Sequence, residues 1–215
     1  MKIAALASHE IEKELRAIFT GAETELFIVK NLNDFLKFDT IDAYFDLEFE
    51  MNRKRIDTLK KFLPKPVFIN AVINTLDEIG EPFIRINAWP TFLQRKICEL
   101  AIQNEASSDN VRIFMNAMPW QYRLVPDEPG MISARIVSMI INEAYYTAEE
   151  KVSSKQEIDI AMKLGTNYPY GPFEWSKKIG IENILQLLEV LEKKDDRYTI
   201  SSMLKNEVAE LSKGK

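Results

Sequence analysis

The sequence is poor in several residues on which protein chemistry often depends. Its 215 residues include one cysteine, Cys98, so an internal disulfide is excluded and a reducing cytoplasm is the expected setting. They also include one histidine, His9, and one histidine with one cysteine cannot supply the usual nitrogen and sulfur ligands of a metal site. We therefore expect no metal.

Excess positive charge and long apolar runs are also lacking. The formal net charge is −5, whereas a protein that binds nucleic acid usually presents a basic face. No segment approaches the roughly 20 apolar residues of a membrane helix, and the apolar run in MKIAALASHEIEKEL is too short for a secretion signal. The expected protein is cytoplasmic, with no nucleic-acid partner and no membrane segment.

What is present is the composition of a folded protein with a proper core, because 46% of the residues are hydrophobic and 28% are charged. The first part of the chain alternates short apolar runs with amphipathic segments. This alternation predicts a wound, mostly parallel sheet with helices between its strands. Strands are expected at 2–7, 25–29, 41–47, 66–73 and 82–87, and helices at 10–19 and 52–62.

After Gly130 the pattern changes to helices alone. Ser154 and Glu157 fit a capping box, Gly165 fits the stop of the helix that they open, and Pro172 suits the first turn of the next helix. The expected helices lie at 132–149, 154–165, 172–180, 182–194 and 200–211. The expected domains are residues 1–126 and residues 127–215, joined near a Pro-Gly turn.

Three motifs in the second part carry a resemblance to a known family. Pro-Gly-Met-Ile at 129–132, Ile-Asp-x-Ala-Met-Lys-Leu-Gly at 158–165 and Tyr-Pro-Tyr-Gly-Pro-Phe-Glu at 168–174 occur in this order. Over roughly residues 127–181 the chain resembles the C-terminal domain of the 3-hydroxyacyl-CoA dehydrogenase family. The resemblance implies a Rossmann-like, NAD-binding-type α/β domain followed by a helical domain. It also implies fatty acid metabolism, an acyl-CoA-type small-molecule partner, and a homodimer formed through the helical domain.

The expected nucleotide loop departs from the family. Members open with G-x-G-x-x-G between the first strand and the first helix, and each glycine makes room for the pyrophosphate or for close packing. Ala7, His9 and Glu12 stand at the three glycine positions. The second strand ends in Val29-Lys30-Asn31, without the acidic residue that holds the adenosine ribose. NAD is thus implied by the resemblance, but these residues argue against it.

The catalytic pair departs from the family as well. The family uses a histidine as base and a glutamate that orients it. An ungapped match places Asn87 at the histidine position and Glu99 at the glutamate position. An asparagine amide has no proton-accepting equilibrium near neutral pH, so Asn87 cannot act as the base.

The substrate-contact positions are only partly kept. Asn70 stands where the family has a serine, and its amide can hydrogen-bond a carbonyl. In the helix start that follows Gly130, Ala134 replaces the family's asparagine, and Arg135 is retained.

Three hypotheses follow from these residues. The first is a 3-hydroxyacyl-CoA dehydrogenase-like protein with weakened or lost oxidoreductase activity, which keeps an acyl-CoA-type cleft or acts as a dimeric scaffold. The second is an active NAD-dependent enzyme whose rearranged site uses Glu99 or His9. The third is a module for protein–protein interaction, favoured by the apolar excess of the helical part.

Overall fold

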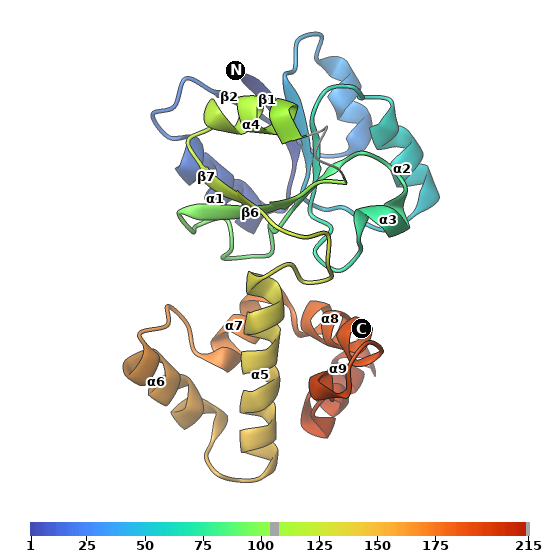
Figure 1. The fold of residues 1–215 in the computed structure, drawn as a ribbon. Coiled ribbons are helices and arrows are strands. Elements are labelled where there is room, and N and C mark those ends of the chain that lie inside the picture. Colours follow the sequence, from blue (N-terminus) through green and yellow to red (C-terminus); the bar gives the residue numbers. More distant parts are fainter. Residues whose placement is uncertain (104–107, 214–215) are drawn as a thin grey trace. The chain divides into compact units, whose positions relative to one another are not determined.

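The computed structural model describes residues 1–103 and 108–213 and divides the chain into two compact units. The first unit, Met1–Met131, is an α/β unit, and the second, Ile132–Lys215, has helices and no strand within its described residues (Figure 1). The expected fold class, a mostly parallel sheet followed by helices, is confirmed. The expected domain limits of 1–126 and 127–215 stay a prediction.

A seven-stranded sheet forms the centre of the first unit. Its strand order is β2-β1-β3-β4-β5-β6-β7. The first five strands pair in parallel, β6 runs antiparallel to β5, and β7 runs parallel to β6. The strands are β1 (Lys2–Leu6), β2 (Glu25–Val29), β3 (Ala43–Asp46), β4 (Val67–Ile69), β5 (Ile84–Ile86), β6 (Ile97–Ala101) and β7 (Gln121–Leu124).

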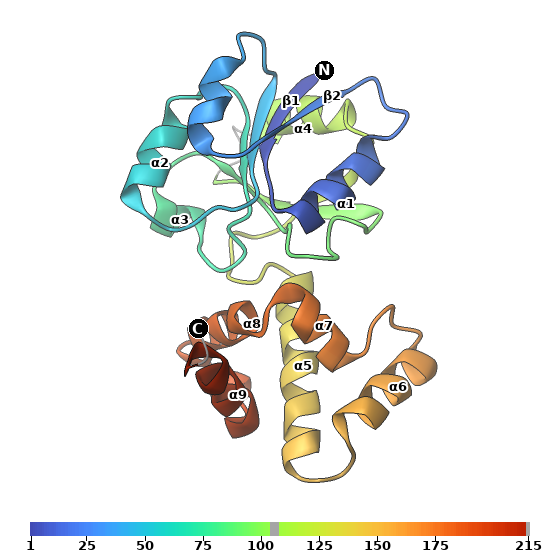
Figure 2. The ribbon, with the colours of Figure 1, turned by 180° about the vertical axis from the view of Figure 1, so that it is seen from behind.

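Helices cover both faces of this sheet (Figures 1 and 2). One face packs against α1 and α4, and the opposite face packs against α2, α3 and η1. Strands buried from both sides must be apolar throughout, which explains the continuous runs in the sequence. The bounds are α1 (His9–Phe19), η1 (Leu32–Lys37), α2 (Arg53–Lys60), α3 (Leu76–Ile79) and α4 (Ser108–Asn116).

The expected strands and helices of the first unit are confirmed to within a few residues at their ends. Five elements of the described part of this unit escaped the sequence patterns: η1, α3, β6, α4 and β7. Both strands alternate between more and less buried side chains, unlike the apolar runs of the first five strands. An alternation of this length carries a weaker signal than a continuous run.

A buried ion pair fixes the end of the first unit. The Arg85 side chain is fully buried and donates to the backbone oxygens of Ala71 and Val72 at 2.7 and 3.0 Å. It also pairs with the carboxylate of Asp127, which accepts a further bond from the N–H of Leu76 at 2.7 Å. The last turn before the helical unit is therefore held onto β5 and the loop that follows β4.

The helical unit is built around α5 (Ser133–Glu149), which contacts the four other α-helices of the unit. The buried Asn142 of α5 donates to the carbonyl of Thr199 at 2.8 Å and accepts from the N–H of Ser201 at 3.0 Å, so it fixes α5 to the chain before the last helix. The remaining helices are α6 (Lys155–Thr166), α7 (Pro172–Ile179), α8 (Ile181–Glu192), η3 (Asp196–Tyr198) and α9 (Ser202–Lys213).

The capping signals of the helical unit are largely confirmed. Ser154 and Glu157 form the expected capping box of α6, and Pro172 opens α7. The expected stop at Gly165 is wrong, because α6 continues through Thr166 and ends at Asn167, which adopts the left-handed conformation with φ 56°. Asparagine tolerates this conformation better than most residues, so it serves as the cap where glycine was expected.

Candidate functional site

The two residues expected at the catalytic positions lie opposite each other where β5 ends beside β6. Asn87 follows β5, Glu99 lies in β6, and the N–H of Asn87 donates to the carbonyl of Glu99 at 3.2 Å. Directly opposed residues of an antiparallel pair point to the same face of the sheet, so their Cβ atoms are close neighbours. The antiparallel turn of the chain between β5 and β6 is what brings them together.

The Asn87 side chain is buried without a hydrogen-bond partner. Only 3% of the residue is exposed, and neither Oδ1 nor Nδ2 has a partner within the part of the chain that the structure describes. A buried polar group without a partner lowers the free energy of unfolding by roughly 1–3 kcal/mol. Native proteins keep such groups rarely, and a functional role is one of the accepted reasons.

Glu99 is half-buried, and its charge acts on the side chain of Arg95. Burial lowers the pKa of the nearby Arg95, and the charge of Glu99 opposes that shift. Arg95 lies over the ring of Phe92, with its guanidinium carbon 4.2 Å from the ring centre. An arginine therefore shares the neighbourhood of the expected pair, and no sequence motif pointed to it.

Asn70, expected as a substrate contact, holds strand ends together. Its Oδ1 accepts from the N–H of Ala88 at 3.0 Å. Its Nδ2 donates to the carbonyls of Leu47 at 3.2 Å and of Ala88 at 3.3 Å. Both amide hydrogens are thus committed to backbone oxygens that follow β3 and β5, and a ligand carbonyl would have to displace one of them.

The segment between β5 and β6 is held by a buried carboxylate. Glu14 of α1 is 7% exposed, and its Oε1 accepts from the N–H of Thr91 at 2.7 Å. Thr91 adopts a left-handed conformation with φ 79°, which is strained for a β-branched residue. Burial raises the pKa of Glu14, and hydrogen bonds from Thr91 and Gln94 oppose that shift.

The loop expected to bind a nucleotide carries side chains at all three glycine positions. α1 begins at His9, and its first-turn N–H groups are partly used, because Glu12 donates to the Ser8 carbonyl at 2.8 Å and Ile11 to the Ser8 hydroxyl at 3.5 Å. The carboxylates of Glu10 and Glu12 also lie in this first turn, where they oppose an anion. His9 is exposed, and Ala7 is half-buried. These residues do not fit the pyrophosphate of NAD.

A polar cavity of about 340 Å³ lies at the neighbouring strand ends. Its walls come from the last residue of β1, the residues after β2, and the start of α2. Arg55 of α2 is fixed there by the fully buried Asp46, which it bonds through Nε at 2.7 Å and Nη2 at 2.5 Å. The lining residues are Leu6, Lys30, Asn31, Leu32, Asn33, Glu48, Asn52, Lys54, Arg55 and Thr58.

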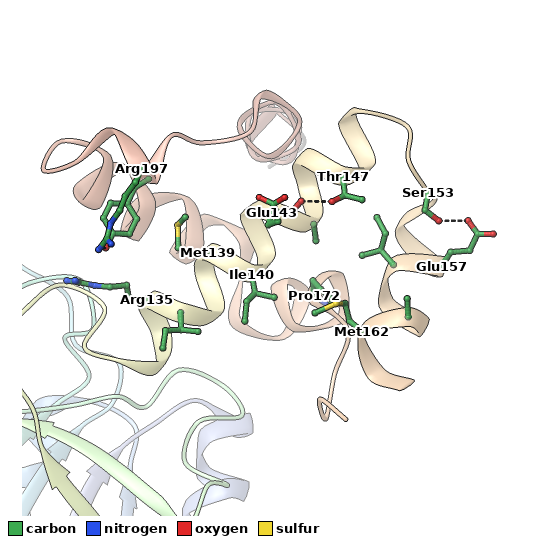
Figure 3. A pocket seen from close by; sticks show the side chains of 15 residues that line it. Arg135, Met139, Ile140, Glu143, Thr147, Ser153, Glu157, Met162, Pro172 and Arg197 are labelled. Atoms are coloured by element: carbon green, nitrogen blue, oxygen red, sulfur yellow. Dashed lines mark hydrogen bonds between the residues drawn. The ribbon is translucent and has the colours of Figure 1, made fainter. Parts of the chain in front are cut away.

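The helical unit carries an apolar groove of about 750 Å³ along α5 and α6. Figure 3 shows Arg135 and Arg197 at one end of the groove, Ser153 and Glu157 at the other, and Met139 between them. Ile136 lines the groove and is 55% exposed. Of the two expected helix-start contacts, Arg135 therefore lines this groove, whereas Ala134 is fully buried.

Residues 1–103 and 108–213 include neither a cluster of metal ligands nor a membrane-spanning helix. No group of three or more His, Cys, Asp or Glu side chains in these ranges is placed to hold a metal ion. None of the helices in these ranges is long and apolar enough to cross a membrane.

Comparison with known proteins confirms the resemblance found in the sequence for the helical part. Residues 130–215 match the model of the 3-hydroxyacyl-CoA dehydrogenase C-terminal domain. The chain is 47% identical over 83 residues to a 3-hydroxyadipyl-CoA dehydrogenase of Escherichia coli. These aligned residues are 38% of this chain and 18% of the relative. It is 42% identical over 82 residues to a 3-hydroxybutyryl-CoA dehydrogenase of Clostridioides difficile, 37% of this chain and 29% of the relative. The matches thus span less than a third of these relatives.

Solved structures extend the similarity to the fold of the whole chain. An (S)-3-hydroxybutyryl-CoA dehydrogenase from Ralstonia eutropha aligns over 97% of this chain and 93% of its own, with a TM-score of 0.75 and 16% identity. A 3-hydroxybutyryl-CoA dehydrogenase from Escherichia coli aligns over 69% of this chain and 32% of its own, with a TM-score of 0.59 and 29% identity. The first likeness shows a shared fold, a Rossmann-type sheet followed by a helical domain.

Proposed function

Taking residues 130–215 as a 3-hydroxyacyl-CoA dehydrogenase-type C-terminal domain, we propose that the chain is a dehydrogenase-like protein with little or no hydride-transfer activity. It binds an acyl-CoA-type small molecule or serves as a dimeric scaffold. The observation that carries this proposal is Asn87, which stands opposite Glu99 where the resemblance requires a base. Backbone pairing sets the two residues opposite each other, but neither amide atom of Asn87 can take a proton near neutral pH.

The expected loss of rate follows from the missing proton acceptor. A positioned general base contributes typically 10²- to 10⁴-fold to a proton transfer. A typical enzyme turns over at about 10 per second, so loss of the base alone should leave about 0.1 per second or less. The poor fit of Ala7, His9 and Glu12 to a pyrophosphate lowers the rate further, because the hydride acceptor is not held.

A turnover assay with acetoacetyl-CoA tests this proposal. The purified chain is incubated with NADH and, separately, with NADPH, and loss of cofactor absorbance is followed. We expect less than about 0.1 turnover per second with either cofactor. A rate of about 10 per second would refute the loss of activity.

Ligand binding without turnover is tested separately. A ligand that binds only the folded state raises its melting temperature by mass action. We expect short acyl-CoAs to raise the melting temperature and NAD(H) to leave it unchanged. If no ligand in a panel of NAD(H), NADP(H), CoA and short acyl-CoAs changes the melting temperature, the proposed ligand binding fails and the protein–protein interaction role is favoured.

An active enzyme with a rearranged site is the alternative within the same family. Glu99 is half-buried beside Asn87, and His9 is exposed at the start of α1, so these two residues are the candidates for proton transfer. Glu99→Gln or His9→Ala would then abolish measured turnover. If both variants keep the rate of the parent chain, this alternative fails.

The groove of the helical unit favours an interaction role, for which a second copy of the chain is the proposed partner. Its walls are apolar over most of their length, and exposed Ile136 contributes to them. Arg135 and Arg197 lie at one end, with Glu143 and Glu157 toward the other (Figure 3). A two-fold axis across the groove would bring the basic end of one copy against the acidic end of the other.

A further inference from the structure

The polar cavity at the carboxyl ends of β1, β2 and β3 has the position of a ligand site. In open α/β sheets, ligands bind outside the carboxyl ends of the strands where the strand order reverses. With the order β2-β1-β3, the reversal falls between β1 and β3. Leu6 ends β1, Lys30 and Asn31 directly follow β2, and Glu48 follows β3, so the cavity includes residues from both sides of that point.

The size of the cavity limits what it can hold. Its volume of about 340 Å³ is at the lower end of the range of roughly 300–1,000 Å³ for small-molecule sites. A mononucleotide fits this range better than a whole dinucleotide. Leu6 and Leu32 supply apolar wall, while Asn33, Asn52 and Thr58 supply amide and hydroxyl groups for hydrogen bonds.

The charges of the lining favour an anion. Lys30, Lys54 and Arg55 line the cavity, against the single carboxylate of Glu48. Arg55 is already neutralised by Asp46, whereas Lys30 and Lys54 enter no ion pair within the described ranges. Two ammonium groups at one cavity mouth, in a chain with net charge −5, therefore make a local anion site.

The side chain after β2 argues against a nucleotide whose adenosine ribose carries only free hydroxyls. A ribose with free hydroxyls is held at the second strand end by a carboxylate, whereas a ribose phosphate is held by a cationic side chain. Lys30 stands directly after β2 where that carboxylate is expected, so this strand end favours a ribose phosphate over free ribose hydroxyls.

We propose that the cavity binds an adenine nucleotide through a phosphomonoester on its ribose, with Lys30 and Lys54 as the phosphate ligands. This chemistry has two sources: the 3′-phosphate of coenzyme A and the 2′-phosphate of NADP(H). The inference is independent of the proposed loss of turnover, because it concerns binding of a nucleotide fragment that undergoes no reaction.

Calorimetric titration of the full chain with four fragments tests the site. Adenosine 3′,5′-bisphosphate represents coenzyme A, adenosine 2′,5′-bisphosphate represents NADP(H), and AMP and adenosine lack the ribose 2′- or 3′-phosphate. We expect one bisphosphate to bind at least tenfold more tightly than AMP, and the tighter of the two identifies the source. Equal affinities for bisphosphates and AMP, or no binding of any fragment at millimolar concentration, would overturn the proposal.

Matched variants connect the binding to the cavity. Lys30→Glu and Lys54→Glu each reverse one charge of the lining, and we expect each to weaken bisphosphate binding at least tenfold. Lys61→Glu is the control, because Lys61 is an exposed lysine at the end of α2 that does not line the cavity. Unchanged binding in both lining variants, or an equal loss in the control, would contradict the site, and circular dichroism verifies that each variant is folded.

Discussion

At the scale of single residues, two asparagines on the sheet should respond in opposite ways to the same substitution. Asn87 is buried with no partner for its amide in the described part of the chain, whereas the Asn70 amide makes three bonds to backbone groups. We expect Asn87→Leu to raise the free energy of unfolding by about 1–3 kcal/mol and Asn70→Leu to lower it by a similar amount. Urea unfolding followed by tryptophan fluorescence measures both. Destabilisation by Asn87→Leu would show that its amide is satisfied.

The buried pair of Arg85 and Asp127 should dominate local stability. Burial lowers the pKa of Arg85, and the Asp127 carboxylate opposes that shift. Asp127→Ala leaves a fully buried guanidinium without its counter-charge. We expect this to lower the free energy of unfolding by roughly 3–5 kcal/mol. Arg53→Ala is the control, because Arg53 forms an exposed pair with Asp57 that is worth about 0–1 kcal/mol. Equal effects of the two variants on the urea midpoint would exclude the assigned role.

Glu14 should make stability depend on pH. Burial raises its pKa in the folded chain, so the folded state holds the proton more tightly than the unfolded state. The stabilising contribution is therefore complete below the ordinary value of 4.5 and is lost as pH rises through the raised pKa. Glu14→Gln keeps an oxygen for the N–H of Thr91 and removes the buried charge. We expect its melting temperature to exceed that of the parent at pH 7 and the difference to shrink toward pH 4.

At the scale of elements, the junction between α6 and α7 depends on a close approach. Asp159 of α6 accepts from the N–H groups of Phe173 and Glu174 at 2.8 and 3.2 Å, so one helix caps the next. A Cβ at Gly171 would collide with the Asp159 side chain. We expect Gly171→Ala to cost about 1–3 kcal/mol of unfolding free energy.

Gly165 is the matched control for that prediction. It lies in the last turn of α6, and a Cβ there meets nothing within 4 Å. Gly165→Ala should be neutral or should stabilise the helix by about 0.5–1 kcal/mol. If thermal unfolding is equally affected by both alanines, the Asp159 cap is not what limits position 171.

At the scale of the whole molecule, the groove on α5 and α6 predicts a dimer. Ile136→Asp places a charge in the groove and should shift the mass measured by light scattering from dimer to monomer. Ile113→Asp is the control, because Ile113 is 71% exposed on α4 and does not line the groove. A monomeric parent chain at micromolar concentration would contradict the proposal.

Much of the fold followed from local patterns. Continuous apolar runs predicted β1 to β5, and the Ser154–Glu157 capping box and Pro172 predicted the starts of α6 and α7. These signals are local because backbone caps and buried strands constrain neighbouring residues directly. β6 and β7 were missed because strand pairing depends on partners far along the chain.

By itself the sequence determined which groups are available: one histidine, an asparagine at position 87, and side chains at the glycine positions of the nucleotide loop. Only the tertiary structure decided what these groups meet. It set Asn87 opposite Glu99, used the Asn70 amide to join strand ends, and gathered Lys30 and Lys54 around one cavity. The physical reason is that hydrogen bonds, burial and charge act through space, and residues twelve or more positions apart become neighbours only when the sheet forms.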